Sequence, residues 1–195
     1  MKKRKIPWLL FLGIGLILVS LVFLAVSRIR VHLGAKQSVR VVGEMERLLP
    51  ESSLGVPGQA LDGDMPALEI AGTDYAALLE ISACDVQLPV AYHWESNRLY
   101  RSPARYSGSA YTGDLVIGGA DSSRQFGFCD QIENGTTVTL TDMTGAKFTY
   151  QVTGVERSRQ AQNQWLMDEN SDLTLFCRDA QTLEYIAVRC NYAYH

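Results

Sequence analysis

An uninterrupted run of 21 residues without a charged side chain, residues 6–26, constrains this chain more than any other feature. A helix of that length spans about 30 Å at about 1.5 Å per residue, which matches the hydrocarbon core of a bilayer. Pro7 is tolerated in a first helical turn, and Trp8 lies at interface depth. A cleavable signal peptide ending near Ala25-Val26-Ser27 is the alternative, but its apolar region usually spans only about 7–15 residues. We therefore expect an uncleaved transmembrane anchor over 6–27.

The charges around the anchor predict its orientation. Residues 2–5 read Lys-Lys-Arg-Lys, whereas four basic residues are spread over positions 28–40. Because the compact basic cluster abuts the N-terminal end, we expect residues 1–5 to be a cytoplasmic tail. The soluble part then lies outside the cell.

The remaining composition limits the kinds of partner and cofactor. Residues 2–5 hold four of the 18 basic side chains, which leaves 14 against 21 acidic ones, a net charge of −7 for the rest of the chain. An acidic domain is a poor partner for nucleic acid. The four cysteines (Cys84, Cys129, Cys177 and Cys190) have no CxxC or Cys/His spacing, so we expect no metal and no cofactor. Disulfides are permitted outside the cytoplasm, but their pairing is open.

Residues 28–66 are predicted to connect the anchor to the domain. From Val39 onward the apolar residues follow helical spacing, which indicates a short amphipathic helix that lifts the domain off the membrane. Residues 50–66 are rich in Gly, Pro, Ser and Asp, a composition typical of a linker.

Residues 67–195 show the pattern of an all-β domain. Short strand-like runs occur at 78–81, 88–91, 115–117, 137–141, 147–155, 173–177 and 185–190. Asp142 to Gly145 separate two of these runs and predict a hairpin turn. The polar stretch 157–170 is expected to be a loop or a short helix. Seven or more strands in about 130 residues indicate a sandwich or a barrel.

Four segments of this domain, 78–93, 99–121, 126–152 and 173–190, together resemble the sortases, the membrane-anchored cysteine transpeptidases of Gram-positive bacteria. The resemblance covers residues 67–191 and implies an eight-stranded β-barrel that cuts a cell-wall sorting signal and joins it to an amine. Its chemistry implies a Cys nucleophile, a His proton donor and an Arg that holds the oxyanion.

The position of the family histidine is substituted in this chain. The family pattern resembles V-I-A-G-H, and here the same place reads Val116-Ile117-Gly118-Gly119-Ala120. A methyl group cannot transfer a proton, so Ala120 removes the general acid that the resemblance implies.

The positions of the family cysteine and arginine allow two alignments. Without gaps over 173–190, the nucleophile position falls on Arg178 and the arginine position on Tyr185. Cys177 then faces the core, because a shift of one residue turns a strand side chain to the opposite face. The alternative deletes one residue before Cys177, adds one to the following loop, and makes Cys177 the nucleophile. A β-bulge could present Cys177 in the same way.

His93 is the one histidine in the domain that could replace the missing acid, because His32 is membrane-proximal and His195 is terminal. A solvated loop histidine is the simpler interpretation of His93. Arg189 is expected about 13 Å further along the strand than Tyr185, so it does not replace the family arginine.

Two functions follow from these substitutions. The first is a catalytically degenerate sortase-like protein that binds a sorting-signal peptide, or serves as a scaffold for a surface or pilus protein. The second is an active cysteine transpeptidase or hydrolase of cell-wall sorting signals that uses Cys177 as nucleophile, with His93 as an unconventional acid.

Overall fold

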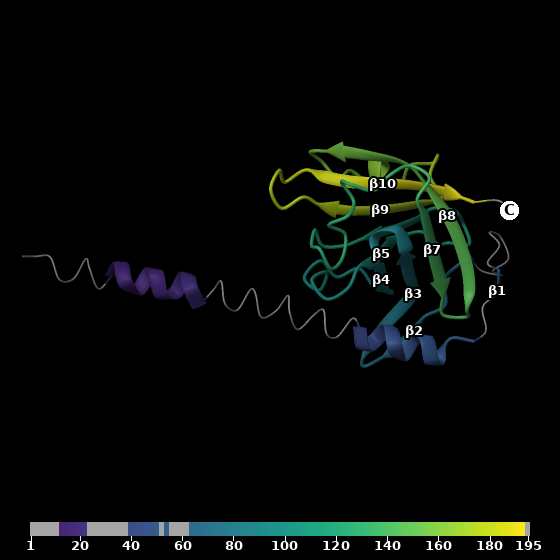
Figure 1. Cartoon of the computed structure of the whole chain (residues 1–195), viewed down its shortest axis with the longest axis horizontal. Helices are drawn as coiled ribbons and strands as arrows, with labels where there is room; N and C mark the ends of the chain where they lie inside the picture. The colour runs from purple at the N-terminus through teal and green to yellow at the C-terminus, as the bar shows by residue number, and fades with distance from the viewer. Residues whose placement is uncertain (1–11, 23–38, 51–52, 55–62, 194–195) are drawn as a thin grey trace, which may run out of the picture.

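The computed structural model describes residues 12–22, 39–50, 53–54 and 63–193, and Figure 1 shows the β domain that most of them form. The described residues contain ten strands in the sheet order β1-β8-β10-β9-β6-β5-β4-β3-β2, and β7 pairs with both β3 and β8. This double pairing closes β3 to β10 into an eight-stranded barrel, as the sequence predicts. The strands are β1 (Ser53–Leu54), β2 (Leu68–Ile70), β3 (Thr73–Ile81), β4 (Val86–Ala91), β5 (Ala104–Ser107), β6 (Leu115–Gly118), β7 (Thr137–Asp142), β8 (Ala146–Ser158), β9 (Leu173–Arg178) and β10 (Tyr185–Tyr192).

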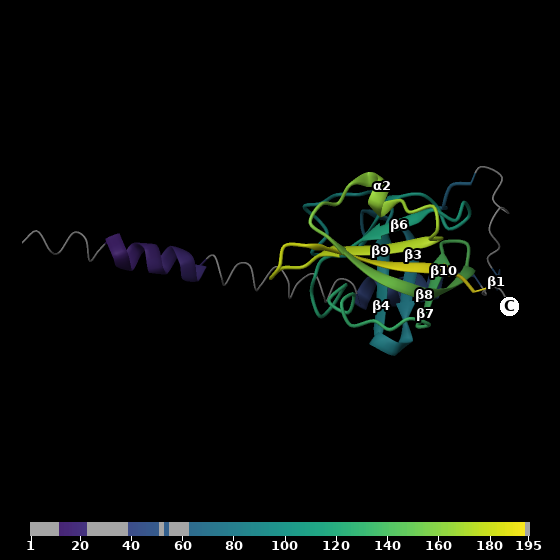
Figure 2. The same cartoon turned by 90° about the horizontal axis from the view of Figure 1, so that it is seen from above.

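Seven strands lie where the sequence predicts them, and most extend further than expected. The strands β1, β2 and β5 were not predicted, because they span only two to four residues and lack the continuous apolar run of the equally short β6. The stretch 157–170 combines the end of β8 with the short helix α2 (Asn163–Leu166), which Figure 2 shows beside β6 and β9.

Apolar side chains from all the barrel strands except β5 fill the interior. The largest fully buried ones include Leu79, Leu140, Phe148, Tyr150 and Leu175. The strand β9 is buried on both faces over Leu173–Cys177, because the barrel core covers one face and α2 with its neighbouring loops covers the other. Every side chain of β9 before Arg178 therefore has a fixed environment.

The predicted hairpin turn between β7 and β8 is present and has a buried carboxylate at its centre. Oδ1 of Asp142 accepts hydrogen bonds from the backbone N–H and the hydroxyl of Thr144 and from the backbone N–H of Ala146, at 2.8, 2.8 and 2.9 Å. Oδ2 accepts from the hydroxyl of Tyr111 at 2.5 Å. Gly145 completes the turn at a φ of 83°, a conformation that favours glycine.

The amphipathic helix that the sequence predicts is present at 39–48 and packs on the domain. Val41, Val42 and Met45 are buried against Ile70 and Leu78 of β2 and β3. Met45 lies four and three residues after Val41 and Val42, so these side chains share one helix face and the barrel itself satisfies the predicted amphipathic pattern.

Part of the predicted linker also belongs to the domain. Ser53 and Leu54 pair with Ala146 and Lys147 of β8. Asp64 forms an ion pair with Arg105 of β5 at 2.6 Å. These contacts fix two points of a stretch whose composition indicates a linker.

Residues 12–22 form a helix within the expected anchor, and most of the remaining anchor and the tail 1–5 lie outside the described residues. Among the described residues, none of the helices combines the length and apolar character that a membrane crossing requires. The transmembrane anchor over 6–27 therefore stays a prediction.

Candidate functional site

The strand pairing brings the three substituted positions to one end of neighbouring strands. β6 runs parallel to β9 with Gly118 opposite Phe176, and the N–H of Gly119 donates to the carbonyl of Phe176 at 2.9 Å. Ala120 follows directly. On the other side of β9, Arg178 lies opposite Tyr185 of β10. The fold thus gathers the positions that the resemblance assigns to the His, Cys and Arg.

Cys177 faces the barrel interior. It is 1% exposed and packs in the same core cluster as Leu173 and Leu175. Its Sγ lies 3.7 Å from the carbonyl oxygen of Phe126. A thiol in this position cannot reach a peptide carbonyl in solvent unless β9 shifts its register.

Arg178 and Tyr185 occupy the surface at this end of the barrel. The guanidinium carbon of Arg178 lies 5.6 Å from the centre of the Tyr185 ring, within the range of a cation–π contact. Nε of Arg178 donates to the carbonyl of Leu183 at 3.2 Å, which ties the side chain to the β9–β10 hairpin. Neither a guanidinium nor a phenol is the thiol nucleophile that the resemblance implies at this position.

Ala120 is held by main-chain contacts and offers no titratable group. Its N–H donates to Oε1 of Gln125 at 3.1 Å. The neighbouring Asp121 accepts a hydrogen bond from the N–H of Ala180 through Oδ2, at 2.9 Å, and so joins the loop after β6 to the β9–β10 hairpin. Sequence reasoning missed this role of Asp121, although an acidic residue next to a predicted site position was a signal for it.

Aromatic side chains cover the outer face of β5, β6, β9 and β10. We call Trp94, Tyr106, Trp165 and Tyr185 the aromatic surface; all four are half-buried, and they pack against the buried Val116, Leu166, Phe176 and Ala187. The hydroxyl of Tyr106 donates to Oδ1 of Asn163 in α2 at 2.7 Å, so the surface is linked from β5 to α2.

Trp94 fits this surface because residue 118 is a glycine. A Cβ at Gly118 would lie 2.4 Å from the Trp94 ring and 2.7 Å from the Phe176 ring. The Trp94 ring stacks on Phe176 with centroids 5.7 Å apart and meets Tyr106 edge-on at 5.0 Å. Trp94 has no recognisable signal in the sequence, since a lone aromatic residue after a strand carries no motif.

A buried arginine holds α2 against the barrel. Arg189 of β10 is 4% exposed and donates to the carboxylate of Glu156, to the hydroxyl of Thr174 and to the carbonyls of Trp165 and Leu166. Its guanidinium also lies 5.2 Å from the centre of the Trp165 ring. Arg189 therefore positions Trp165, at one side of the aromatic surface, through contacts with its carbonyl and its ring.

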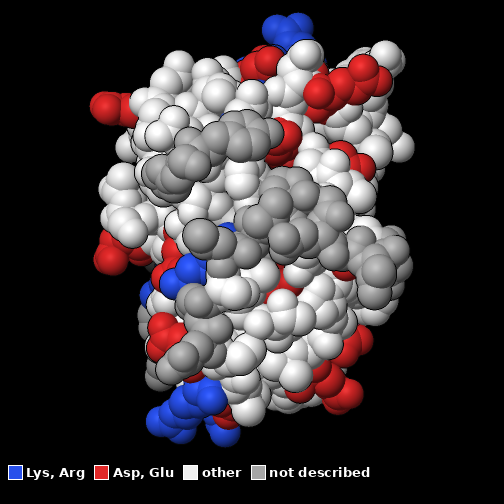
Figure 3. All heavy atoms as spheres, turned by 90° about the vertical axis from the view of Figure 1, so that its right-hand side faces the viewer, with Lys and Arg blue, Asp and Glu red and all other residues white. Residues whose placement is uncertain are grey.

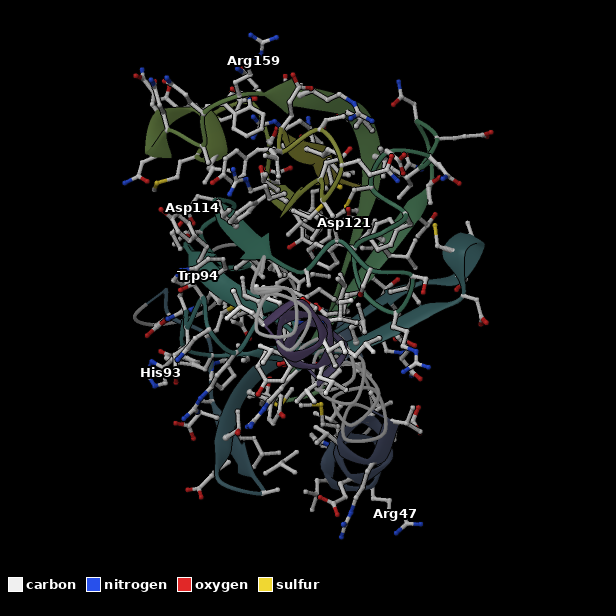
Figure 4. The ribbon with its side chains drawn as sticks, turned by 90° about the vertical axis from the view of Figure 1, so that its left-hand side faces the viewer. Arg47, His93, Trp94, Asp114, Asp121 and Arg159 are labelled. Carbon is white, nitrogen blue, oxygen red and sulfur yellow. The ribbon has the colours of Figure 1, made fainter. Side chains whose placement is uncertain are left out.

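His93 lies away from Cys177, Arg178 and Tyr185, in a cleft that Trp94 and Tyr106 also line. Its Nε2 lies 3.7 Å from the carboxylate of Asp74, and its ring meets the ring of Tyr92 edge-on. His93 lines two clefts, of about 190 and 490 Å³, and neither is lined by Cys177, Arg178 or Tyr185. Figure 4 shows His93 at the periphery, apart from Asp121 near the middle of the view. The structure therefore does not bring His93 and Cys177 together.

The charges on the domain are dispersed. Figure 3 shows one face on which acidic side chains lie around the rim and basic ones form separate small groups. Within the described part of the chain, no group of three or more His, Cys, Asp or Glu side chains is arranged to hold a metal ion.

Comparison with known proteins connects this chain to one fold. No protein-family profile and no curated sequence matches it. Among solved structures, sortase C1 from Streptococcus agalactiae is 21% identical, with a TM-score of 0.56 over 66% of this chain and 72% of that one. Sortase A from Corynebacterium diphtheriae is 19% identical, with a TM-score of 0.55 over 88% and 86% of the two chains. A Clostridium perfringens sortase D5 transpeptidase is 16% identical, with a TM-score of 0.54 over 67% and 83%. The domain therefore has the sortase fold.

Proposed function

We propose that this protein is a catalytically inactive, membrane-anchored sortase-fold protein that binds an extended peptide, such as a sorting signal, at the cell surface. The observation that carries the proposal is the arrangement at the ends of β6, β9 and β10. Cys177 is buried, while Ala120, Arg178 and Tyr185 occupy the positions that the resemblance assigns to the catalytic groups.

Loss of these groups removes each step of the transpeptidase reaction. The reaction needs a thiolate that attacks the peptide carbonyl, an acid that protonates the leaving amine and a cation that holds the oxyanion. Acid–base and oxyanion contributions are each worth about 10² or more in rate, so their combined loss with the nucleophile leaves little catalysis. The guanidinium of Arg178 remains, but without an adjacent nucleophile it has no covalent intermediate to stabilise.

The aromatic surface supports peptide binding. Half-buried rings that pack on buried side chains offer apolar contact area at a small cost in conformational entropy. The Arg178 guanidinium borders Tyr185 and provides a donor for a peptide carbonyl or carboxylate. This combination suits an extended segment that has apolar side chains and a free backbone.

The proposed location follows from the sequence around the N-terminus. The uncharged run at 6–26 and the basic residues 2–5 favour a single-pass anchor over 6–27 with the N-terminus in the cytoplasm. The barrel then faces the cell wall, where sorting-signal peptides and surface or pilus proteins are its expected partners.

The proposal is tested by adding labelled sorting-signal-type peptides to the purified chain and measuring cleavage and binding in parallel. We expect no cleavage, and saturable binding that Tyr185→Ala weakens at least tenfold. Val155→Ala, an exposed apolar truncation on β8, is the matched control and should bind normally. Binding that is equally strong in both variants would place the peptide elsewhere, and absence of binding would leave only a scaffold role.

The same assay separates the enzymatic alternative. If the chain cleaves a peptide and Cys177→Ala abolishes cleavage while the domain stays folded, the protein is an active cysteine transpeptidase or hydrolase and the proposal is wrong. Cleavage that survives Cys177→Ala would rule out Cys177 as the nucleophile.

A further inference from the structure

The barrel interior holds three of the four cysteines. Cys129, Cys177 and Cys190 are at most 1% exposed, whereas Cys84 is half-buried in the short 3-10 turn Ser82–Cys84 between β3 and β4. Cys129 lies in the turn segment 119–136 that connects β6 to β7. Cys177 lies on β9, 48 residues further along the chain.

One carbonyl group brings two of these thiols together. The oxygen of Phe126 accepts a hydrogen bond from the N–H of Cys129 at 3.1 Å, and Sγ of Cys177 lies 3.7 Å from the same oxygen. The backbone N of Cys129 and the Sγ of Cys177 therefore lie at most 6.8 Å apart, the sum of these two distances. Both side chains are also buried in the barrel core.

We propose that Cys129 and Cys177 form an intramolecular disulfide in an oxidising environment and thereby fasten the 119–136 segment to β9. The thiolate of one cysteine attacks a sulfur of a small-molecule disulfide, RS–SR, and releases RS⁻. The thiolate of the second then attacks the protein-bound sulfur and releases the other RS⁻. Overall the two protein thiols give up two protons and two electrons, and RS–SR is reduced to two RSH.

The strand register excludes Cys190 as the partner of Cys177. Cys177 pairs with Ile186 on β10, whereas Cys190 pairs with Leu173. The four residues between these pairs correspond to about 13 Å along the strands, well beyond the roughly 4–7 Å between the Cα atoms of a disulfide. Cys129 is therefore the partner that the geometry offers to Cys177.

The timing of the reaction follows from the environment of the thiols. Burial, and secondarily the contact with Cys177, raises the pKa of the Cys129 thiol well above its usual value. Because the thiolate is the attacking species, oxidation is disfavoured in the closed barrel. We expect the bond to form during folding, or when the 119–136 segment opens briefly. Once formed, the disulfide prevents Cys177 from acting as a nucleophile. Formation of the disulfide does not require a bound peptide, so its test is independent of the proposed peptide binding.

The test uses the full chain, refolded with glutathione disulfide, then unfolded, alkylated with N-ethylmaleimide without reductant, and mapped by mass spectrometry. We expect a linked pair of peptides containing Cys129 and Cys177, while Cys190 is alkylated. Four alkylated cysteines, or a linkage that uses Cys190 or Cys84 instead, would overturn the proposal.

A second measurement follows the melting temperature of the wild type and of two cysteine variants. For a loop of this length, reductant should lower the melting temperature of the oxidised wild type by on the order of 5–15 °C. Cys84→Ser is the matched control and should keep this shift, whereas Cys129→Ser should lose it. A wild-type melting temperature that is the same with and without reductant contradicts the proposal.

Discussion

Replacing Arg189 with methionine tests whether one buried guanidinium holds α2 on the barrel. Arg189→Met keeps much of the side-chain length but removes every donor from a side chain that is 5% exposed. The carbonyls of Trp165 and Leu166 lose their partner, at a cost of about 1 kcal/mol each when water reaches them incompletely. The Glu156 partner is 48% exposed, so its ion pair contributes about 1 kcal/mol or less.

We therefore expect Arg189→Met to lower the free energy of unfolding by about 3 kcal/mol, which corresponds to about 6–12 °C in melting temperature for a chain of this size. Urea denaturation measures the first quantity and calorimetry the second. Hydrogen exchange at 163–167 should also accelerate, because this segment loses its anchor.

Arg157→Met is the matched control for this experiment. Arg157 lies on β8, is 42% exposed and faces Asp179 at 3.5 Å, so its loss should change the free energy of unfolding by less than about 0.5 kcal/mol. Similar small effects of both substitutions would refute the reasoning that burial and the two main-chain carbonyls make Arg189 important.

Three further perturbations have measurable outcomes. The hydrogen bond from Arg105, followed by the one from Tyr92, lowers the pKa of Asp64 to about 2, so the contribution of Asp64 to stability is complete above about pH 4 and is lost as the pH falls towards 2; wild-type stability should fall more steeply there than that of Asp64→Asn. Burial and the hydrogen bond to Asp142 raise the pKa of Tyr111 to about 12, so its contribution is complete below about pH 10 and is lost towards pH 12; Tyr111→Phe should flatten this alkaline limb in urea titrations. Gly118→Val should displace the Trp94 ring and shift tryptophan emission to longer wavelength.

Each of these outcomes has a clear opposite. Gly154→Val places a side chain in open space on β8, so its emission should match the wild type; an equal emission shift in both variants would contradict the contact between Gly118 and Trp94. For the titrations, identical pH profiles of wild type and variant would show that the pKa values of Asp64 and Tyr111 do not differ between the folded and unfolded states.

The barrel was predictable from the sequence because its strands combine apolar runs with turn residues that have a local physical role. Asp142 and Gly145 are an example, since both the buried carboxylate and the positive φ depend on residues within the turn. The short strand β5 was not predictable, because Ala104–Ser107 has a single buried residue and no apolar run.

The candidate site was predictable only in part. The sequence around β9 allowed two alignments for Cys177. Only the pairing of β9 with β10, in which Arg178 lies opposite Tyr185, gives the position of Cys177 in space. The contact of Trp94 with Gly118 depends on a loop folding over a strand that follows it by more than 20 residues. No local pattern encodes such a contact, which explains why the aromatic surface was missed.

The docked helix at 39–48 limits how far the barrel can travel. If residues 6–27 span the membrane as we propose, residues 28–38 alone form the tether, and 11 extended residues reach at most about 40 Å. Had the whole of 28–66 been free, the reach would be about 135 Å. Because Val41, Val42 and Met45 pack the helix against β2 and β3, the anchored domain would then search only a thin layer next to the bilayer. A partner held in the same membrane would meet it at a high effective concentration, whereas one in the outer cell wall would be out of range.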